Sequence, residues 1–214
     1  MYFHDRFQAG KLLGKELEKK YRYEDCVAIA LNEGGVLVSV EICKILHCLI
    51  NLLLIEEIYL PQEPDIVGAL TLEGKFSLSK NFSSEIIEEN REVIEEEKLK
   101  KIAKINAIKN FGNVLNKKDI IGRNVILVSD GLKSVLPLEV AYEYLKPLKI
   151  NKFIIATSIA TVDVVDWMHI YADEIHCLNV IESGLDINHY YKDNRIFDRE
   201  KIVNLVNNII LNWE

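Results

Sequence analysis

Five runs rich in apolar residues, each with β-branched members, recur along the chain and limit most strongly what it can fold into. They are CVAIAL, LINLLLI, VILVS, KFIIATSIA and ADEIHCLNV, at residues 26–31, 49–55, 125–129, 152–160 and 172–180. Strands that are continuously apolar are typical of parallel sheets, because helical crossovers cover both of their faces. Helical spacing of apolar residues follows or precedes these runs, at residues 5–21, 36–46, 138–145, 162–170 and 198–213. We therefore predict an α/β fold, with a central and mainly parallel sheet covered by helices on both faces.

Two segments depart from this alternation. Residues 65–79 alternate in polarity around Glu73-Gly74, which predicts two short antiparallel strands joined by a turn. Residues 83–111 contain no proline or glycine, and their acids come first and their lysines last, which suits a helix dipole. This predicts a long helix or a pair of helices, which either only keeps the chain soluble, arches over a site, or packs against a second subunit.

We expect residues 1–214 to form a single domain. Within it, residues 82–112 form a helical insertion and residues 190–214 a C-terminal tail and helix. The 214 residues are 49% hydrophobic, enough for a full core, and the formal net charge of -7 argues against nucleic acid and anionic membranes as partners. No apolar run is long enough to span a bilayer, and the N-terminus lacks the apolar segment of a signal peptide. The four cysteines form no CxxC pair, so we expect buried thiols in a cytoplasmic protein.

The turn SDGLKS is the first candidate site, because ligands of open α/β sheets bind at the carboxyl ends of the strands. A strand that ends at Asp130 and Gly131 and leads into a helix exposes N–H groups that attract an anion. Asp130 is suited to accept hydrogen bonds from sugar hydroxyls, and Ser134 to cap the helix. Val135 and Leu136 add bulk where a phosphate cradle needs bare backbone, so an ordinary strand-to-helix turn is the alternative. The candidate residues are Ser129, Asp130, Gly131, Leu132, Lys133 and Ser134.

Two further turns carry candidate residues. Asn32, Glu33, Gly34 and Gly35 follow a buried strand, and the glycine pair permits positive φ and a close backbone approach, although the glutamate repels phosphate. Glu56 and Glu57 are expected to end the second strand, where paired carboxylates suit a divalent cation or acid–base chemistry. Solvated acids at a strand exit are the alternative.

Five segments of the chain, in the same order, resemble the type I phosphoribosyltransferases, and most closely a small bacterial group of that family. The segments are FHDRFQAGKLL, LNEGGVLVS, EEIYLPQEPDIVGA, VILVSDGLKSVLP and HYYKDNRIFD, at residues 3–13, 31–39, 56–69, 125–137 and 189–198. The resemblance implies that the turn at residues 129–134 binds the ribose and 5′-phosphate of phosphoribosyl pyrophosphate, with Mg²⁺ as cofactor. It implies that the glycine pair binds pyrophosphate.

The chain departs from the family pattern at the residues that carry chemistry. Ser129 replaces the first of two acids, and Val135 and Pro137 replace a glycine and a threonine of the phosphate loop. Asn32-Glu33 stands for Pro-Arg and Glu56-Glu57 for Arg-Lys, so three cationic positions are acidic. Two unit charges ~4 Å apart interact by about 4 kcal/mol at an effective dielectric of ~20. Because the acids repel the phosphates of the anionic sugar donor, we expect that donor to bind poorly.

Three functions follow from these observations. The first is a degenerate phosphoribosyltransferase that acts as a binding or assembly protein and holds a small phosphate or nucleotide near Asp130. The second is an active phosphoribosyltransferase with an altered site. The third is a magnesium-dependent hydrolase that uses Glu33, Glu56, Glu57 and Asp130. The long charged helix also favours a homodimer.

Overall fold

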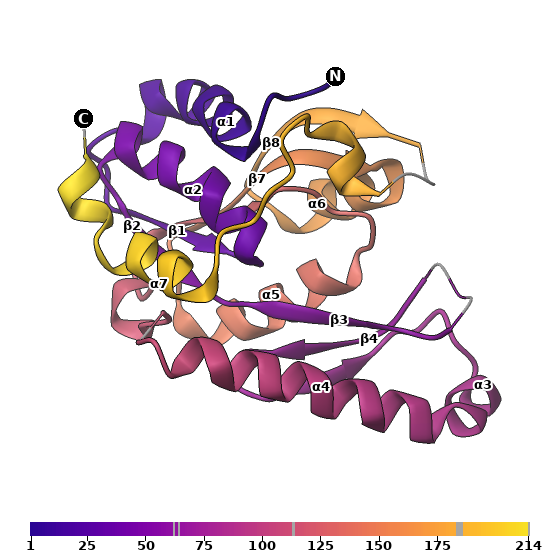
Figure 1. Ribbon diagram of the computed structural model, residues 1–214. Helices are drawn as coiled ribbons and strands as arrows, with labels where there is room; N and C mark the ends of the chain where they lie inside the picture. The colour runs from indigo at the N-terminus through magenta and orange to yellow at the C-terminus, as the bar shows by residue number, and fades with distance from the viewer. Residues whose placement is uncertain (62, 64, 113, 183–185, 214) are drawn as a thin grey trace.

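The computed structural model describes residues 1–61, 63, 65–112, 114–182 and 186–213 and contains a five-stranded parallel sheet beside a smaller antiparallel one (Figure 1). The parallel sheet has the strand order β2-β1-β6-β7-β8. Its strands are β1 Cys26–Ala30, β2 Leu49–Leu52, β6 Asn124–Ser129, β7 Lys152–Thr161 and β8 Glu174–Ile181. The predicted fold class is confirmed, because each apolar run contributes a strand to this sheet.

Alternate residues of the central strands supply two separate cores, one on each face of the sheet. On one face, Ile126 and Val128 pack with the helices α1 (Arg6–Tyr21), α2 (Glu33–Leu46) and α7 (Arg199–Asn207). On the other face, Val125 and Leu127 pack with α5 (Leu136–Leu145) and α6 (Val162–Tyr171). Burial on both faces explains why these strands are continuously apolar.

The apolar run at residues 49–55 does not form one strand. β2 ends at Leu52, Leu54 has a positive φ of 25°, and Ile55 begins β3 (Ile55–Tyr59) in the second sheet. Leu53 and Leu54 are both fully buried and face different cores. The run is therefore apolar on both sides of the change of sheet, so the sequence pattern does not indicate that one strand ends and another begins within it.

The second sheet has the order β3-β4-β5, with β4 at Ile66–Thr71 and β5 at Phe76–Leu78. β4 and β5 form the predicted antiparallel hairpin, and Gly74 in its turn has a φ of +89°. The segment expected to be helical forms α3 (Ser84–Glu89) and α4 (Arg91–Lys109), which meet at Asn90. In Figure 1, α4 runs along β3 and β4, so this helix lies over the small sheet.

Short 3₁₀ turns complete the described chain, at Lys117–Asp119, Lys146–Leu148, Ile187–Tyr190 and Ile209–Asn212. Of the four thiols, Cys26, Cys43 and Cys48 are buried and Cys177 is half-buried, with burial raising the pKa of Cys26 to about 12. Within the described residues, no helix combines the length and apolar character that crossing a membrane requires.

An acid-sensitive cluster joins α1 to the edge strand β8. The Glu174 carboxylate is partly buried, which alone would raise its pKa, but bonds from Lys20, Tyr21 and His176 lower it to about 2. A carboxyl whose folded pKa lies below its unfolded value of about 4.3 stabilises the fold above that value and loses this contribution as the pH falls towards 2. We expect Glu174→Gln to destabilise the protein by about 1 kcal/mol at pH 7, because water screens part of the interaction. Urea titrations at pH 7 and pH 2.5 check this: the difference between the two proteins should shrink at pH 2.5, and an unchanged difference would contradict the assignment.

Candidate functional site

A cavity of about 340 Å³ lies at the carboxyl ends of β1 and β6. The first turn of α2, the turn after β6, strand β3, helix α4 and the segment around residues 186–196 all contribute to its wall. It is lined by Arg6, Asn32, Glu33, Gly34, Ile55, Glu56, Glu57, Tyr59, Lys101, Lys104, Asp130, Gly131, Lys133, Asp186, Ile187, Asn188 and Ile196. Residues from all three candidate segments therefore converge, whereas Ser129, Leu132, Ser134 and Gly35 are not among the residues that line the cavity.

The Asp130 carboxylate is paired with Arg6 in the interior of the protein. Arg6 Nε donates to Asp130 Oδ2 at 2.7 Å, and the two residues are 3% and 5% exposed. The guanidinium also donates to Asn188 Oδ1 at 2.7 Å and to the Asn194 carbonyl at 3.1 Å. It lies 4.5 Å from the ring centroid of Tyr191, whose hydroxyl donates to the Asp130 carbonyl at 2.6 Å.

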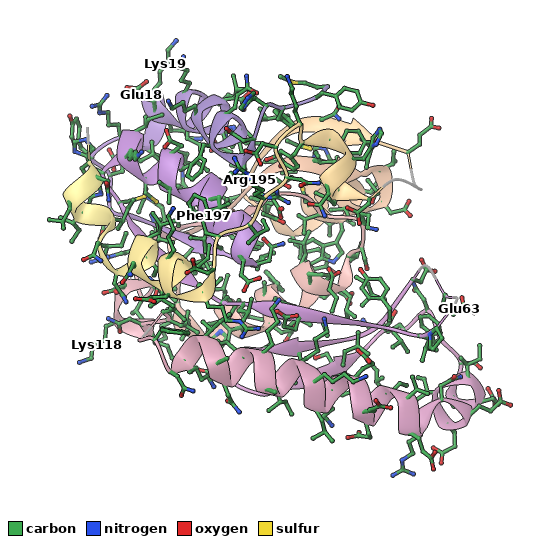
Figure 2. The ribbon with its side chains drawn as sticks, in the orientation of Figure 1. Glu18, Lys19, Glu63, Lys118, Arg195 and Phe197 are labelled. Carbon is green, nitrogen blue, oxygen red and sulfur yellow. The ribbon has the colours of Figure 1, made fainter. Side chains whose placement is uncertain are left out.

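Sequence reasoning did not identify Arg6 as a site residue. It belongs to the segment FHDRFQAGKLL, whose likeness to the family assigns no role to the arginine. The segment that it contacts, around residues 194–198, crosses in front of α2, where Figure 2 labels Arg195 and Phe197. Arg6 therefore joins the start of the chain, the acid after β6 and the C-terminal segment.

The NEGG turn is helical, which corrects the predicted loop. α2 begins at Glu33, and Asn32 caps it by accepting a hydrogen bond from the Gly35 N–H at 2.6 Å. Neither glycine has a positive φ. Both glycines are closely packed against the protein itself, because a Cβ on Gly34 would lie 2.1 Å from Asp130 Oδ2 and one on Gly35 would lie 2.8 Å from the Val128 carbonyl oxygen.

Two N–H groups of the SDGLKS turn already have acceptors within the protein. Gly131 N–H donates to Ser129 Oγ at 3.2 Å, and Leu132 N–H donates to the Ile159 carbonyl at 2.9 Å. Ile187 packs on Gly131 so closely that a Cβ there would lie 2.5 Å from its side chain. These contacts occupy part of the surface that an anion cradle would present.

The start of α5 differs from the prediction by one residue. Ser134 Oγ accepts from the Leu136 N–H at 3.3 Å, but Val135 occupies the N-cap position and makes no side-chain capping bond. Pro137 lies in the first turn of the helix, where its missing N–H costs little.

Glu56 and Glu57 lie inside β3, not at the exit of the second strand, and the prediction of solvated acids there is wrong for Glu56. Lys104 Nζ lies 2.5 Å from Glu56 Oε1 and 3.3 Å from Glu33 Oε2, and Lys101 Nζ lies 3.2 Å from Glu56 Oε2. Burial raises the pKa of Glu57, against the effect of a 2.5 Å hydrogen bond from the Tyr59 hydroxyl.

The cavity is much closer to electrical neutrality than the motifs alone suggest. Five carboxylates and four basic side chains line it, because α4 brings Lys101 and Lys104 to Glu33 and Glu56. Among the described residues, Lys133 is the one lining base for which we find no ion pair within 4.0 Å. No group of three or more His, Cys, Asp or Glu residues in the described ranges is placed to hold a metal ion.

No protein-family model matches the chain. The Mycobacterium tuberculosis protein named "Putative phosphoribosyl transferase Rv0571c" is 24% identical to it over 179 residues, which are 82% of this chain and 40% of that protein. The protein named "Putative phosphoribosyl transferase MT0597", from another strain of the same species, matches equally. The chain thus spans about two fifths of the length of these curated relatives.

Two solved structures share the architecture. The protein TT1426 from Thermus thermophilus superposes with a TM-score of 0.67 at 21% identity, covering 96% of this chain and 98% of that one. A hypoxanthine phosphoribosyltransferase from Staphylococcus aureus gives a TM-score of 0.51 at 15% identity, covering 86% of this chain and 77% of that one. At these identities the likeness is one of fold.

Proposed function

We propose that this chain, which has the fold of the type I phosphoribosyltransferases, binds a small phosphate-bearing ligand and does not transfer phosphoribosyl groups. The observation that carries the proposal is the buried Arg6–Asp130 ion pair. The resemblance of the chain to the family implies that the acid at position 130 holds ribose hydroxyls. A carboxylate that is 5% exposed and paired at 2.7 Å is poorly placed to accept them.

The turn after β6 supports the same proposal. The N–H groups of Gly131 and Leu132 have internal acceptors, so a bound phosphate would have to displace those acceptors. A hydrogen bond to a charged group contributes about 1.5–3 kcal/mol, and a micromolar ligand binds with about 8 kcal/mol in total. The loss of two such bonds removes a large share of that binding free energy. Lys133 remains exposed at the cavity, as a cation for a single phosphate group.

The residues present do not fit magnesium held by the carboxylates of this cavity. Mg²⁺ in proteins is bound through carboxylates, water and substrate phosphates. Here Asp130 is bonded to Arg6, and Glu56 and Glu33 are bonded to Lys104. These pairs also disfavour the magnesium-dependent hydrolase, because its four acids share one cavity but three of them have cationic partners.

Calorimetric titration with phosphoribosyl pyrophosphate and Mg²⁺ tests the proposal. We expect a dissociation constant of about 1 mM or weaker, and no exchange of labelled pyrophosphate into the sugar donor. Micromolar affinity would contradict the expected loss of donor binding, and exchange that Asp130→Asn abolishes would establish an active enzyme instead.

A second titration examines the residual site with ribose 5-phosphate as the probe. We expect Lys133→Glu to weaken binding at least about tenfold, since reversing one charge near the phosphate costs more than ~1.4 kcal/mol. Lys118→Glu is the matched control, because this exposed side chain points away from the molecule in Figure 2 and does not line the cavity. Equal effects of the two variants would show that only the overall charge matters and that the turn holds no phosphate.

A further inference from the structure

A second cavity, of about 470 Å³, lies between the small antiparallel sheet and the helices α5 and α6. It shares no lining residue with the cavity at the strand ends. We call it the aromatic groove, and it is lined by Lys75, Ser77, Leu78, Lys80, Leu136, Glu139, Val140, Tyr142, Glu143, Lys146, Trp167 and Tyr171. Its volume lies within the range of small-molecule sites.

Three aromatic side chains form one wall of the aromatic groove. The rings of Trp167 and Tyr171 stack with centroids 4.4 Å apart and an interplanar angle of 25°. The ring of Tyr142 meets Trp167 at 83° and 6.1 Å, and lies 5.3 Å from Tyr171. Tyr171 is 44% exposed, so the stack is accessible at the surface. Mutual packing fixes the ring planes, and a fixed aromatic surface is what a planar ligand needs for stacking.

Charged side chains of both signs surround the rings. Lys75 and Lys80 flank β5, and Lys146 follows α5. Lys80 Nζ lies 3.5 Å from Glu139 Oε1, an ion pair between the hairpin and α5. For Lys75 and Lys146 we find no ion pair within 4.0 Å among the described residues, so their charges are available to an anion.

We propose that the aromatic groove binds a nucleotide. The base stacks on the Trp167–Tyr171 pair, and the phosphate lies near Lys75 and Lys146. The carboxylates of Glu139 and Glu143 accept hydrogen bonds from the hydroxyl or amino groups of the nucleoside. A nucleotide therefore uses all three kinds of lining group, namely rings, cations and acceptors.

Two other occupants fit the groove less well. An acidic peptide would suit the lysines, but it would place several carboxylates beside Glu139 and Glu143, where a nucleotide places a single phosphate group. A second copy docked over this face would bury the charges of Lys75 and Lys146, and burying charged side chains that lack a partner is costly.

Trp167 provides the measurement, because the chain contains two tryptophans and Trp213→Phe leaves it as the sole one. In that background we expect AMP to quench the Trp167 fluorescence saturably. Adenosine should bind at least tenfold more weakly than AMP, because it lacks the phosphate. Ribose 5-phosphate should cause no quenching, because it lacks the base.

Variants separate the aromatic groove from the cavity at the strand ends. We expect Lys146→Glu and Tyr171→Ala each to weaken the AMP-dependent quenching of Trp167 at least tenfold, and Lys133→Glu to leave this quenching unchanged. Absence of AMP quenching, adenosine as tight as AMP, or loss of the Trp167 quenching in Lys133→Glu would each overturn the proposal. Light scattering identifies the other occupant, since a dimer that Tyr171→Ala dissociates would assign the groove to a second copy. All of these results concern the groove, so they do not depend on whether the cavity at the strand ends transfers phosphoribosyl groups.

Discussion

Replacing Arg6 with methionine is expected to lower the free energy of unfolding by about 3–5 kcal/mol, because it leaves the Asp130 carboxylate buried without a charge partner. The guanidinium makes three hydrogen bonds, to Asp130, Asn188 and the Asn194 carbonyl, and a methionine makes none of them. Methionine keeps most of the side-chain length, so lost packing contributes little. Urea denaturation at pH 7 measures the effect as a fall in the midpoint.

Two variants control for this prediction. Arg195 and Asp193 form an ion pair at 2.5 Å on the surface, and the Arg195 side chain is 83% exposed. We expect Arg195→Met to change stability by less than ~1 kcal/mol, because surface ion pairs contribute little. The double variant Arg6→Met/Asp130→Asn should recover part of the loss, because it removes the unpaired charge. If Arg6→Met cost no more than Arg195→Met, the buried pair would have no special role.

The sequence predicts those features of the fold that depend on neighbouring residues. Burial on both faces makes the central strands of the parallel sheet continuously apolar, as at residues 125–129, and the helices between the strands keep their own spacing. The rule that ligands bind at the carboxyl ends of parallel strands brings the turns at residues 32–35 and 129–134 to one cavity. Neither inference needs knowledge of contacts between distant segments.

The features that the sequence does not predict depend on such contacts. Comparison with the family pattern shows three acids in place of cations, and it indicates a strongly negative pocket. The structure brings Lys101 and Lys104 against Glu56 from a helix about 45 residues further along the chain. Arg6 meets Asp130 across a separation of 124 residues. No local motif encodes either pairing, so a charge count confined to the motifs gives the wrong electrostatic balance.

The second large effect is expected at Gly10, in the contact between α1 and α2. A Cβ on Gly10 would lie 2.3 Å from the Val38 carbonyl oxygen, and this neighbour is backbone of α2. Alanine normally stabilises an exposed helix by about 1 kcal/mol relative to glycine. In Gly10→Ala the helices must move apart, and overpacking of this kind costs about 1–3 kcal/mol or more. We therefore expect the free energy of unfolding to fall by about 2 kcal/mol, whereas helix propensity alone would raise it. Urea denaturation should show this loss as a lower midpoint.

Gly14, one turn later in α1, distinguishes steric conflict from propensity. A Cβ there would lie 2.7 Å from Ile45 Cδ1, the mobile end of a side chain, and 3.4 Å from the Cα of Ile42, its nearest backbone neighbour. Gly14→Ala should therefore cost less than Gly10→Ala, because Ile45 can rotate away. Lys19→Ala, on the solvent side of α1 in Figure 2, should change stability by no more than ~0.5 kcal/mol. A Gly10→Ala protein as stable as the parent would mean that α1 and α2 are not held at this distance, and the position of Arg6 at the start of α1 would then lack its support.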